Sequence, residues 1–331
     1  MTELGCEITN LYTGLMRESV RSNLHSRDNF WPTEASCVDD DGKVHGKCLR
    51  DIQYSMLGTE NKREPDEYNF MTWNIGKSIE SMHQKVLAQG GLLVAPNVKI
   101  RYDFGDGITV SGELDSIIRY KGELLGVEFK TFHGYFPWSQ CVSGIGQSSH
   151  HIQVMLYLHM LSQQDWCLGQ TLSYRSGQVV ACLLPSDGSS ESIKINKFLL
   201  RYDDRGVTSQ YLKGKDGRSP FGTFHIVELH NDHLIVDGVD YPGITISSVM
   251  DRFNIIHAHI KDSKLVACDY HPRYSDDQLR SMYEEYKVEA KAAREKDKRK
   301  SVKRYETFAK ENYADWQCRY CSYRDQCLDD G

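Results

Sequence analysis

Two carboxylates and a lysine lie in one segment that the sequence predicts to be a β-hairpin. Residues 112–130 are typical of two strands joined by Lys121-Gly122, a pair that suits a two-residue turn. With this turn, Asp115 lies opposite Glu128 and on the same face as Lys130. Opposed like charges are destabilising unless a cation compensates them or one carboxyl pKa rises. Oxygen ligands of this kind suit Mg²⁺ or Mn²⁺, so the segment predicts a divalent-metal site.

The second face of the same hairpin is mostly apolar and could be buried. The opposed pairs on this face are Leu114 with Phe129, Ser116 with Val127 and Ile118 with Leu125. An ordinary surface hairpin with a salt-bridged polar face is the alternative interpretation, because Glu-x-Lys alone is a weak signal. The segments on either side of the hairpin favour the metal site.

A helix predicted from Trp73 to Ala88 comes before the hairpin strands, since its apolar residues recur at helical spacing and Gly90-Gly91 follows it. Its polar residues include Glu80 and His83, which lie one turn apart and could face the same way. Taken alone, Glu80 could equally be a solvated residue of an amphipathic helix.

A second helix, predicted from about His150 to Ser162, comes after the hairpin. It carries Gln153 and Tyr157 four residues apart, and this spacing places both on one helix face. Both side chains can form hydrogen bonds, either to a DNA phosphate or to the region around the lysine. A half-buried polar pair without a role in chemistry is the alternative.

Three cysteines cluster near the C-terminus with the spacing Cys-x2-Cys-x5-Cys: Cys318, Cys321 and Cys327. Thiolates gathered within ten residues are strong evidence for a bound metal, and a tetrahedral site needs a fourth ligand from elsewhere in the chain. The remaining cysteines outside the ligand set are interpreted as packed or surface thiols; they are Cys6, Cys141, Cys167, Cys182 and Cys268.

The overall composition narrows the class of protein. The chain has 331 residues, of which 40% are hydrophobic, so it can form a sizeable core. The sequence contains neither an apolar run of the roughly 20 residues that span a membrane nor a recognisable secretion signal, so the expected location is the cytoplasm. Ten cysteines in that compartment favour metal binding over disulfides. The net charge of −6 gives no global attraction to nucleic acid.

Local basic residues could nevertheless bind a DNA backbone. They concentrate in a polar helix predicted from Ser275 to about Asn312 and are Lys298, Arg299, Lys300, Lys303 and Arg304. A solvated helix with internal ion pairs is an equally good interpretation. Elsewhere, patterns predict helices at about 7–25 and 48–57, strands at 92–102, 109–120 and 124–132, and a β-rich region at about 170–245.

The order of these motifs resembles the PD-(D/E)XK nucleases, in particular the RecB-like branch and the CRISPR-adaptation nuclease. The matching series is Gly-x-x-x-Glu at Gly76 and Glu80, then Asp115, then Glu128-Phe129-Lys130, then Gln-x-x-x-Tyr at Gln153 and Tyr157. The resemblance extends from about Cys48 to Cys327. The commoner form of the first motif ends in His, so the choice between Glu80 and His83 stays open.

The resemblance implies a role for each residue. Asp115, Glu128 and Glu80 or His83 would hold Mg²⁺ or Mn²⁺, helped by the Phe129 carbonyl. Lys130 would position or activate the attacking water, with Gln153 and Tyr157 in support. Hydrolysis of a DNA phosphodiester by metal-activated water is the implied reaction.

Similar nucleases, including phage-type exonucleases, also carry an iron–sulfur cluster with one upstream cysteine and three at the C-terminus. By this resemblance the first ligand is Cys48, with Cys37 as its rival, and Cys318, Cys321 and Cys327 complete a [4Fe–4S] site. Zn²⁺ is the alternative metal. The cluster would join the N- and C-terminal regions.

The implied fold is α/β, with a restriction-endonuclease-like core in which helices flank a mixed central sheet. We expect a single elaborated nuclease domain over residues 1–331. Its parts are an N-terminal helical region at 1–60, a catalytic core at 70–165, the β-rich elaboration at 170–245, and a basic helix with the cluster-binding C-terminus at 275–331.

The sequence therefore predicts a metal-dependent DNA nuclease, with an exonuclease favoured by family analogy, in the cytoplasm of a bacterium or a phage-infected cell. Its partner would be single-stranded DNA or duplex ends, with no membrane; a homo-oligomer or a recombination or adaptation protein stays open. Two alternatives remain: a DNA-end-binding or scaffolding subunit with a dormant site, and a zinc-stabilised binding module.

Overall fold

The computed structural model describes residues 26–59, 67–132, 147–172, 179–204, 223–270, 274, 276–296, 298, 301–312, 315–319 and 321–330. The chain divides into two compact units. The sheet unit comprises Asp28–Lys47 and Glu67–Ala258, and the cysteine unit comprises Met1–Arg27, Cys48–Asp66 and His259–Gly331. The helix predicted at about 7–25 lies outside the described residues.

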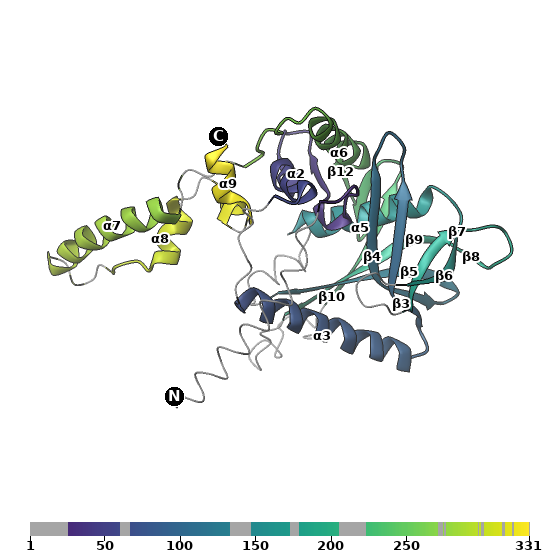
Figure 1. Ribbon diagram of the computed structural model, residues 1–331. Helices are drawn as coiled ribbons and strands as arrows, with labels where there is room; N and C mark the ends of the chain where they lie inside the picture. The colour runs from purple at the N-terminus through teal and green to yellow at the C-terminus, as the bar shows by residue number, and fades with distance from the viewer. Residues whose placement is uncertain are drawn as a thin grey trace, which may run out of the picture. The chain divides into compact units, whose positions relative to one another are not determined.

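A ten-stranded mixed sheet forms the centre of the sheet unit, with the strand order β12-β11-β10-β9-β5-β4-β3-β7-β6-β8 (Figure 1). Its strands are β3 Leu93–Asp103, β4 Thr109–Tyr120, β5 Glu123–Phe132, β6 Trp166–Leu172, β7 Val179–Pro185, β8 Ser192–Ile193, β9 Ile195–Asp204, β10 Thr223–His230, β11 His233–Val236 and β12 Val239–Thr245. The pairs β5–β9 and β3–β7 are parallel, and the other neighbours are antiparallel. The prediction of a mixed central sheet flanked by helices is confirmed.

The hairpin β4–β5 has the register that the sequence predicts. Ser116 pairs with Val127 and Ile118 with Leu125, around a turn in which Lys121 and Gly122 both have positive φ, at 49° and 87°. A turn with two left-handed residues matches the twist of the strands that it joins. The register matters because a shift by one residue would move every side chain to the other face.

Helix α3 (Glu67–Gln89) covers the apolar face of this hairpin. Leu87 of α3 packs against a buried cluster formed by Ile118, Leu125, Val127 and Phe129. The helix begins six residues before the predicted Trp73, because residues 67–72 continue the same helical backbone and Phe70 among them is buried. The buried apolar face therefore fixes α3 against the strands that carry the carboxylates.

Helix α5 (Ser148–Ser162) lies on the other side of the sheet from α3 and packs against β9 and β10 (Figure 1). Two glycines allow this approach. A Cβ atom on Gly126 would lie 2.3 Å from the ring of Phe198, and one on Gly112 would lie 2.8 Å from the ring of Tyr157. Phe198 and Tyr157 in turn stack with ring centroids 5.9 Å apart, so α5, β9 and the hairpin interlock through aromatic rings.

Smaller elements complete the sheet unit. They are the 3-10 helix η1 (Pro32–Glu34), the paired strands β1 (Ser36–Val38) and β2 (Val44–Gly46), and helix α6 (Ile246–Lys261). The residues of α6 up to Ala258 belong to this unit. The sequence did not predict α6. The predicted β-rich region at 170–245 corresponds to β6–β12. Among the described residues, the helices are all too short or too polar to cross a bilayer.

The cysteine unit is built from helices α2 (Leu49–Leu57), α7 (Asp276–Lys296), α8 (Tyr305–Asn312) and α9 (Arg324–Asp329), with the 3-10 helix η2 (Trp316–Arg319). The prediction of one helix over 275–312 is wrong, because the chain turns back after Lys296 and α8 packs on α7. Phe308 of α8 stacks on Tyr286 of α7 with centroids 5.0 Å apart. This aromatic contact buries surface that a single straight helix would leave exposed.

Of the basic residues predicted to bind a DNA backbone, those that the structure describes lie in the connection between α7 and α8. Lys298, Lys303 and Arg304 are exposed there, whereas Arg299 and Lys300 fall outside the described residues. A role of these cations in DNA binding remains a prediction.

Replacing Gly126 tests the interlock of α5, β9 and the hairpin. Because its added Cβ would collide with the fully buried ring of Phe198, Gly126→Ala is expected to lower the free energy of unfolding by about 1–3 kcal/mol. Gly90→Ala is the matched control, since its Cβ would meet neighbours only at ordinary contact distances, 3.5 Å or more. Urea unfolding of both variants measures the difference, and equal stabilities would contradict the packing described.

Candidate active site

Three carboxylates approach one another from three elements of the sheet unit: Glu80 of α3, Asp115 of β4 and Glu128 of β5. Glu80 and Glu128 are buried. Burial raises the pKa of Asp115 well above its usual range, and the negative charges of Glu128 and Glu80 raise it further. Like charges in a medium of low dielectric repel strongly, so this group favours either a proton or a bound cation.

The carboxylates meet where the two hairpin strands separate. Regular pairing of β4 with β5 extends to Ser116 and Val127, while β5 continues along β9, with Glu128 beside Leu200. At the point of separation, the backbone N–H of Phe129 donates to Oδ2 of Asp115 over 2.8 Å. This bond holds the Asp115 carboxylate beside the start of the Glu-x-Lys motif.

Lys130 is held by two oxygen acceptors. Its Nζ lies 2.7 Å from Oε1 of Glu128 and 2.9 Å from Oε1 of Gln153. The amide of Gln153 closes a ring of three side chains, because its Nε2 donates to the same Glu128 oxygen over 2.8 Å. The structure thus shows Gln153 in contact with Lys130. The sequence had left open whether this side chain binds the region around the lysine or a DNA phosphate.

Polar residues around Glu80 fix the third carboxylate. Lys77 Nζ donates to its Oε2 over 2.9 Å, and Asn97 Nδ2 donates to its Oε1 over 2.9 Å. Gln84, one turn further along α3, donates to the backbone carbonyl of Asp115 over 2.9 Å and to Oδ1 of Asn97 over 3.2 Å. These contacts tie the Glu80 side of the helix to β3 and β4.

Sequence reasoning did not find Lys77, Gln84 or Asn97. Gln84 lies four residues after Glu80 on one helix face, a spacing that could have indicated it. Asn97 interrupts the β3–β4 pairing with a φ of +49°, a conformation that Asn adopts more readily than most residues. Its contact with Glu80 depends on tertiary packing.

Tyr157 supports the backbone of β4. Its hydroxyl donates to the carbonyl oxygen of Glu113 over 2.9 Å, and its ring is buried. Burial raises the pKa of Tyr157 well above its usual range, and the charges of Glu128 and Asp115 act in the same direction. The phenol therefore stays protonated and keeps its donor role near neutral pH.

His83, the rival of Glu80, faces a different group. Its Nε2 lies 3.0 Å from Oδ2 of Asp203, and its ring stacks on Phe129 with centroids 5.1 Å apart. Arg201 also binds Asp203 through two nitrogen atoms. These contacts place Glu80 with the carboxylates, whereas His83 packs against Phe129.

His150 lies on the face of α5 that also carries Gln153. Burial lowers the pKa of His150 well below its usual range, and the nearby charge of Lys130 lowers it further. The imidazole is therefore neutral at neutral pH. Among the described residues, Lys130 is the only cation in hydrogen-bond contact with Glu128.

One oxygen of the carboxylate group suits a divalent cation. Oε2 of Glu128 is buried and has no hydrogen-bond partner among the described residues. A buried carboxylate oxygen without a partner is costly, and a hard cation would satisfy it. With the side chains as they stand, no three Cys, His, Asp or Glu groups in the described part of the chain form a ready metal site. Ion pairs with Lys130 and Lys77 occupy the other oxygens of Glu128 and Glu80.

A second group of side chains with metal-binding chemistry lies in the cysteine unit. The sulfur of Cys268 lies 2.9 Å from that of Cys327, and Cys48 forms a hydrogen bond with Cys268. These bonds from Cys268 lower the pKa of Cys48 to about 6 and that of Cys327 to about 7. Thiols with such low pKa values readily become thiolate ligands.

The structure places Cys268 in contact with two of the predicted cluster cysteines, Cys48 and Cys327. It belongs to the thiol group, and the sequence missed it because Cys268 is far from the clustered cysteines along the chain. Cys318 and Cys321 are near enough to Cys48 to interact with it electrostatically. Cys37, the rival first ligand, is buried in the sheet unit beside Arg252 and Thr245. Cys6 and Cys141 lie outside the described residues.

Comparisons with known proteins give one family match. A family model described as the PD-(D/E)XK nuclease superfamily matches residues 75–328, more than half of the chain. Among solved structures, the chain is similar to one titled "Crystal structure of SSO0001", with 15% identity over 60% of this chain and 73% of that chain. The TM-score of 0.34 is too low for that likeness to support any conclusion. A search of curated proteins gave no match.

Removing the Asp115 charge tests the electrostatics of this site. Because the folded pKa of Asp115 is raised, its ionisation destabilises the fold increasingly as pH rises from the unfolded value of about 3.9 through the folded value. Asp115→Asn keeps the acceptor for the Phe129 N–H. It is expected to raise the free energy of unfolding at about pH 7, in a metal chelator, by on the order of 1 kcal/mol.

The gain should shrink as the pH falls towards about 4 and vanish below it, where wild-type Asp115 is protonated in both states. Asp165→Asn, at an exposed position of the same unit, is the control and should change little. Chemical unfolding across this pH range gives the answer. A variant that is less stable than wild type at neutral pH would contradict the described repulsion.

Proposed function

The chain belongs to the PD-(D/E)XK nuclease superfamily, and from this premise we propose that it is a metal-dependent DNA nuclease with its active site at Asp115, Glu128 and Lys130. The observation that carries the proposal is the ring of Lys130, Glu128 and Gln153 beside the buried Asp115. A surface hairpin has no reason to bury Glu128 and leave one of its oxygens without a hydrogen-bond partner among the described residues.

Asp115, Glu128 and Glu80 would hold Mg²⁺ or Mn²⁺, and the Phe129 carbonyl is proposed to assist them. When bound, such an ion polarises the phosphate and makes hydroxide available near neutral pH. The chain positions its ligands before any metal arrives: the Phe129 N–H fixes Asp115, and Asn97 with Gln84 fixes Glu80. Preorganised ligands lower the reorganisation needed on binding.

Lys130 is proposed to orient the attacking water and to stabilise the charge that develops on the phosphate. Glu128 and Gln153 take up two of the three N–H donors of its ammonium group. The third donor remains for the substrate. Gln153 and Tyr157 act as positioning residues, because Gln153 binds Lys130 and Tyr157 binds the backbone at Glu113.

Exonuclease action on single-stranded DNA or duplex ends is proposed by analogy with RecB-like nucleases. Lys298, Lys303 and Arg304 are exposed cations that could contact a DNA backbone.

A [4Fe–4S] cluster is proposed for the cysteine unit, with Cys48, Cys318, Cys321 and Cys327 as ligands and zinc as the alternative metal. Thiols from α2 and from the C-terminal segment converge here, which supports a soft-metal site. Its role would be to tie these two segments of the unit together. Tyr54 of α2 and Tyr323, just before α9, already pack with ring centroids 5.4 Å apart.

The decisive experiment is cleavage of end-labelled single- and double-stranded DNA by anaerobically purified protein with Mg²⁺ or Mn²⁺. Lys130→Ala and Asp115→Ala are each expected to lower the rate by about 10²–10⁴-fold, because each removes a group that acts on the reacting phosphate. Gln153→Ala removes one acceptor of Lys130 and one donor to Glu128, and it should lose about 10–100-fold. The product ladder gives the polarity.

Lys194→Ala is the matched control, as this lysine is exposed in the same unit and distant in sequence from the motifs. It should cleave like wild type. If folded wild type binds DNA but does not cleave it with either metal, the nuclease proposal is wrong and a scaffolding subunit is the better interpretation.

A further inference from the structure

Five thiols gather in the cysteine unit, one more than a four-coordinate metal site uses. Four of them are the proposed ligands Cys48, Cys318, Cys321 and Cys327. The fifth is Cys268, from the segment between α6 and α7, and its sulfur lies 2.9 Å from that of Cys327. Cys268 also forms a hydrogen bond with Cys48, and the thiols further contact backbone N–H, carboxylate or guanidinium groups.

Two sulfurs at this separation cannot occupy different corners of one metal site. Zinc–thiolate bonds of about 2.3 Å in a tetrahedron place neighbouring sulfurs about 3.8 Å apart. In an iron–sulfur cluster the thiolates bind different iron atoms and lie further apart still. As placed, the sulfurs of Cys268 and Cys327 thus occupy the space of one corner.

We propose that Cys268 and Cys327 are interchangeable ligands for one corner of the proposed metal cluster, with Cys48, Cys318 and Cys321 at the other three. The inference rests on the proposed cluster and adds a ligand to it. Either thiol can bind while the other stays free, so the loss of one leaves a complete set of four.

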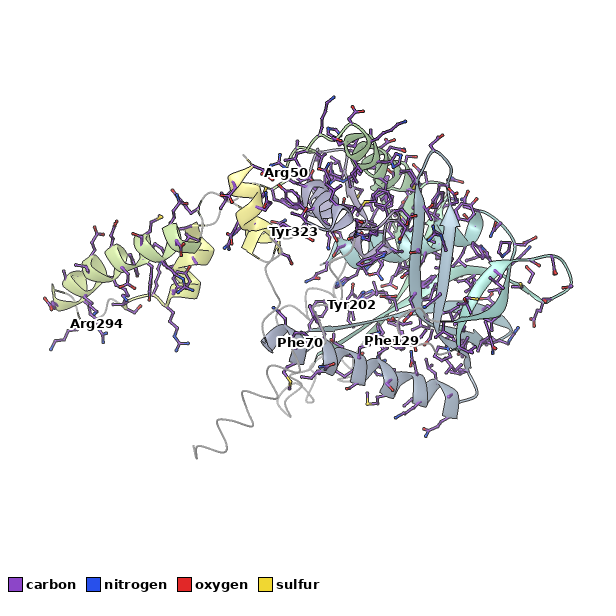
Figure 2. All side chains as sticks on the ribbon, viewed as in Figure 1. Arg50, Phe70, Phe129, Tyr202, Arg294 and Tyr323 are labelled. Carbon is purple, nitrogen blue, oxygen red and sulfur yellow. The ribbon has the colours of Figure 1, made fainter. Side chains whose placement is uncertain are left out.

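Neighbouring contacts hold both cysteines in place for this exchange. Arg50 of α2 (labelled in Figure 2) donates from Nε to the carbonyl of Val266 over 2.8 Å and lies 3.9 Å from Cys327 through Nη1. Its buried guanidinium thus connects the segment that carries Cys268 to the one that carries Cys327. The Cys268 segment is also fixed to α2, because Asp269 accepts the Leu49 N–H over 2.7 Å and donates its own N–H to Cys48.

The other thiols have separate surroundings, which is why they are not expected to be replaceable. Cys321 lies 3.7 Å from Oδ1 of Asp51 and accepts the Tyr323 N–H over 3.4 Å. Cys318 is buried. Cys48 also forms a hydrogen bond with Cys268. The test therefore includes Cys48, to show whether Cys48 or Cys327 shares a corner with Cys268.

The test is metal content in full-length protein purified anaerobically. Iron, zinc and acid-labile sulfide per chain are measured for wild type and for Cys268→Ser, Cys327→Ser, the double variant, Cys48→Ser and Cys318→Ser. Both single variants at the shared corner should keep most of the wild-type metal. The double variant, Cys48→Ser and Cys318→Ser should each lose about tenfold or more.

Cys182→Ser, at a buried thiol of the sheet unit, is the control and should keep its metal. If Cys327→Ser is depleted as strongly as Cys48→Ser, or if Cys268→Ser alone is depleted, the corner is not shared and the proposal is overturned. A wild type without iron, sulfide or zinc overturns it together with the cluster. DNA cleavage with Mg²⁺ on the same preparation then decides the nuclease proposal separately, because the carboxylate site consists of residues of the sheet unit.

A second measurement on wild type guards against variants that fail to fold. Native alkylation of the metal-loaded protein, followed by peptide mass spectrometry, should label Cys268 and Cys327 to a combined extent of about one per chain, since one thiol of the pair stays free. Cys48 and Cys318 should be protected until the metal is removed. Full protection of both thiols, or full labelling of both, would contradict a shared corner.

Discussion

The repulsion among buried carboxylates is the constraint on which the rest of the sheet unit depends. Asp115, Glu128 and Glu80 come from three different elements, and burial together with the neighbouring charges raises the pKa of Asp115 well above its usual range. Such a group is stable only if the surrounding structure is rigid enough to hold it and if a cation or proton relieves it. Lys130 is one such cation, and Oε2 of Glu128, which has no hydrogen-bond partner in the described part of the chain, could bind another.

Rigidity around this group comes from packing on both sides of β5. Its apolar residues meet Leu87 of α3 on one face, and Gly126 admits the Phe198 ring on the other. Because β5 pairs with β4 and β9 at once, Glu128 and Lys130 lie on an inner strand and not at an edge. The separation of β4 from β5 beyond Ser116 then opens the space in which the Phe129 N–H can bind Asp115. The family match over residues 75–328 is consistent with this arrangement.

Local features were predictable from the sequence, whereas features that depend on tertiary contacts were not. The β4–β5 register followed from Lys121-Gly122 and from the alternation of apolar residues, both properties of one short segment. The contacts of Gln84 with the Asp115 carbonyl and of Asn97 with Glu80 join elements whose relative placement no periodicity reveals. For the same reason Cys268 was missed, as only the folded chain brings it to Cys327. The break after Lys296 went undetected because α7, α8 and the residues between them share a polar composition.

The central claim is that a divalent cation replaces the proton on the buried carboxylates. Calorimetric titration of Mg²⁺ or Mn²⁺ into the protein, in buffers of different ionisation enthalpy from about pH 5 to about pH 8, measures the protons released on binding. Wild type should release protons over part of this range, because the raised pKa of Asp115 keeps it partly protonated without metal. Asp115→Asn should bind more weakly and release fewer. Metal binding that releases no protons at any pH, or that is unaffected by Asp115→Asn, would contradict the claim.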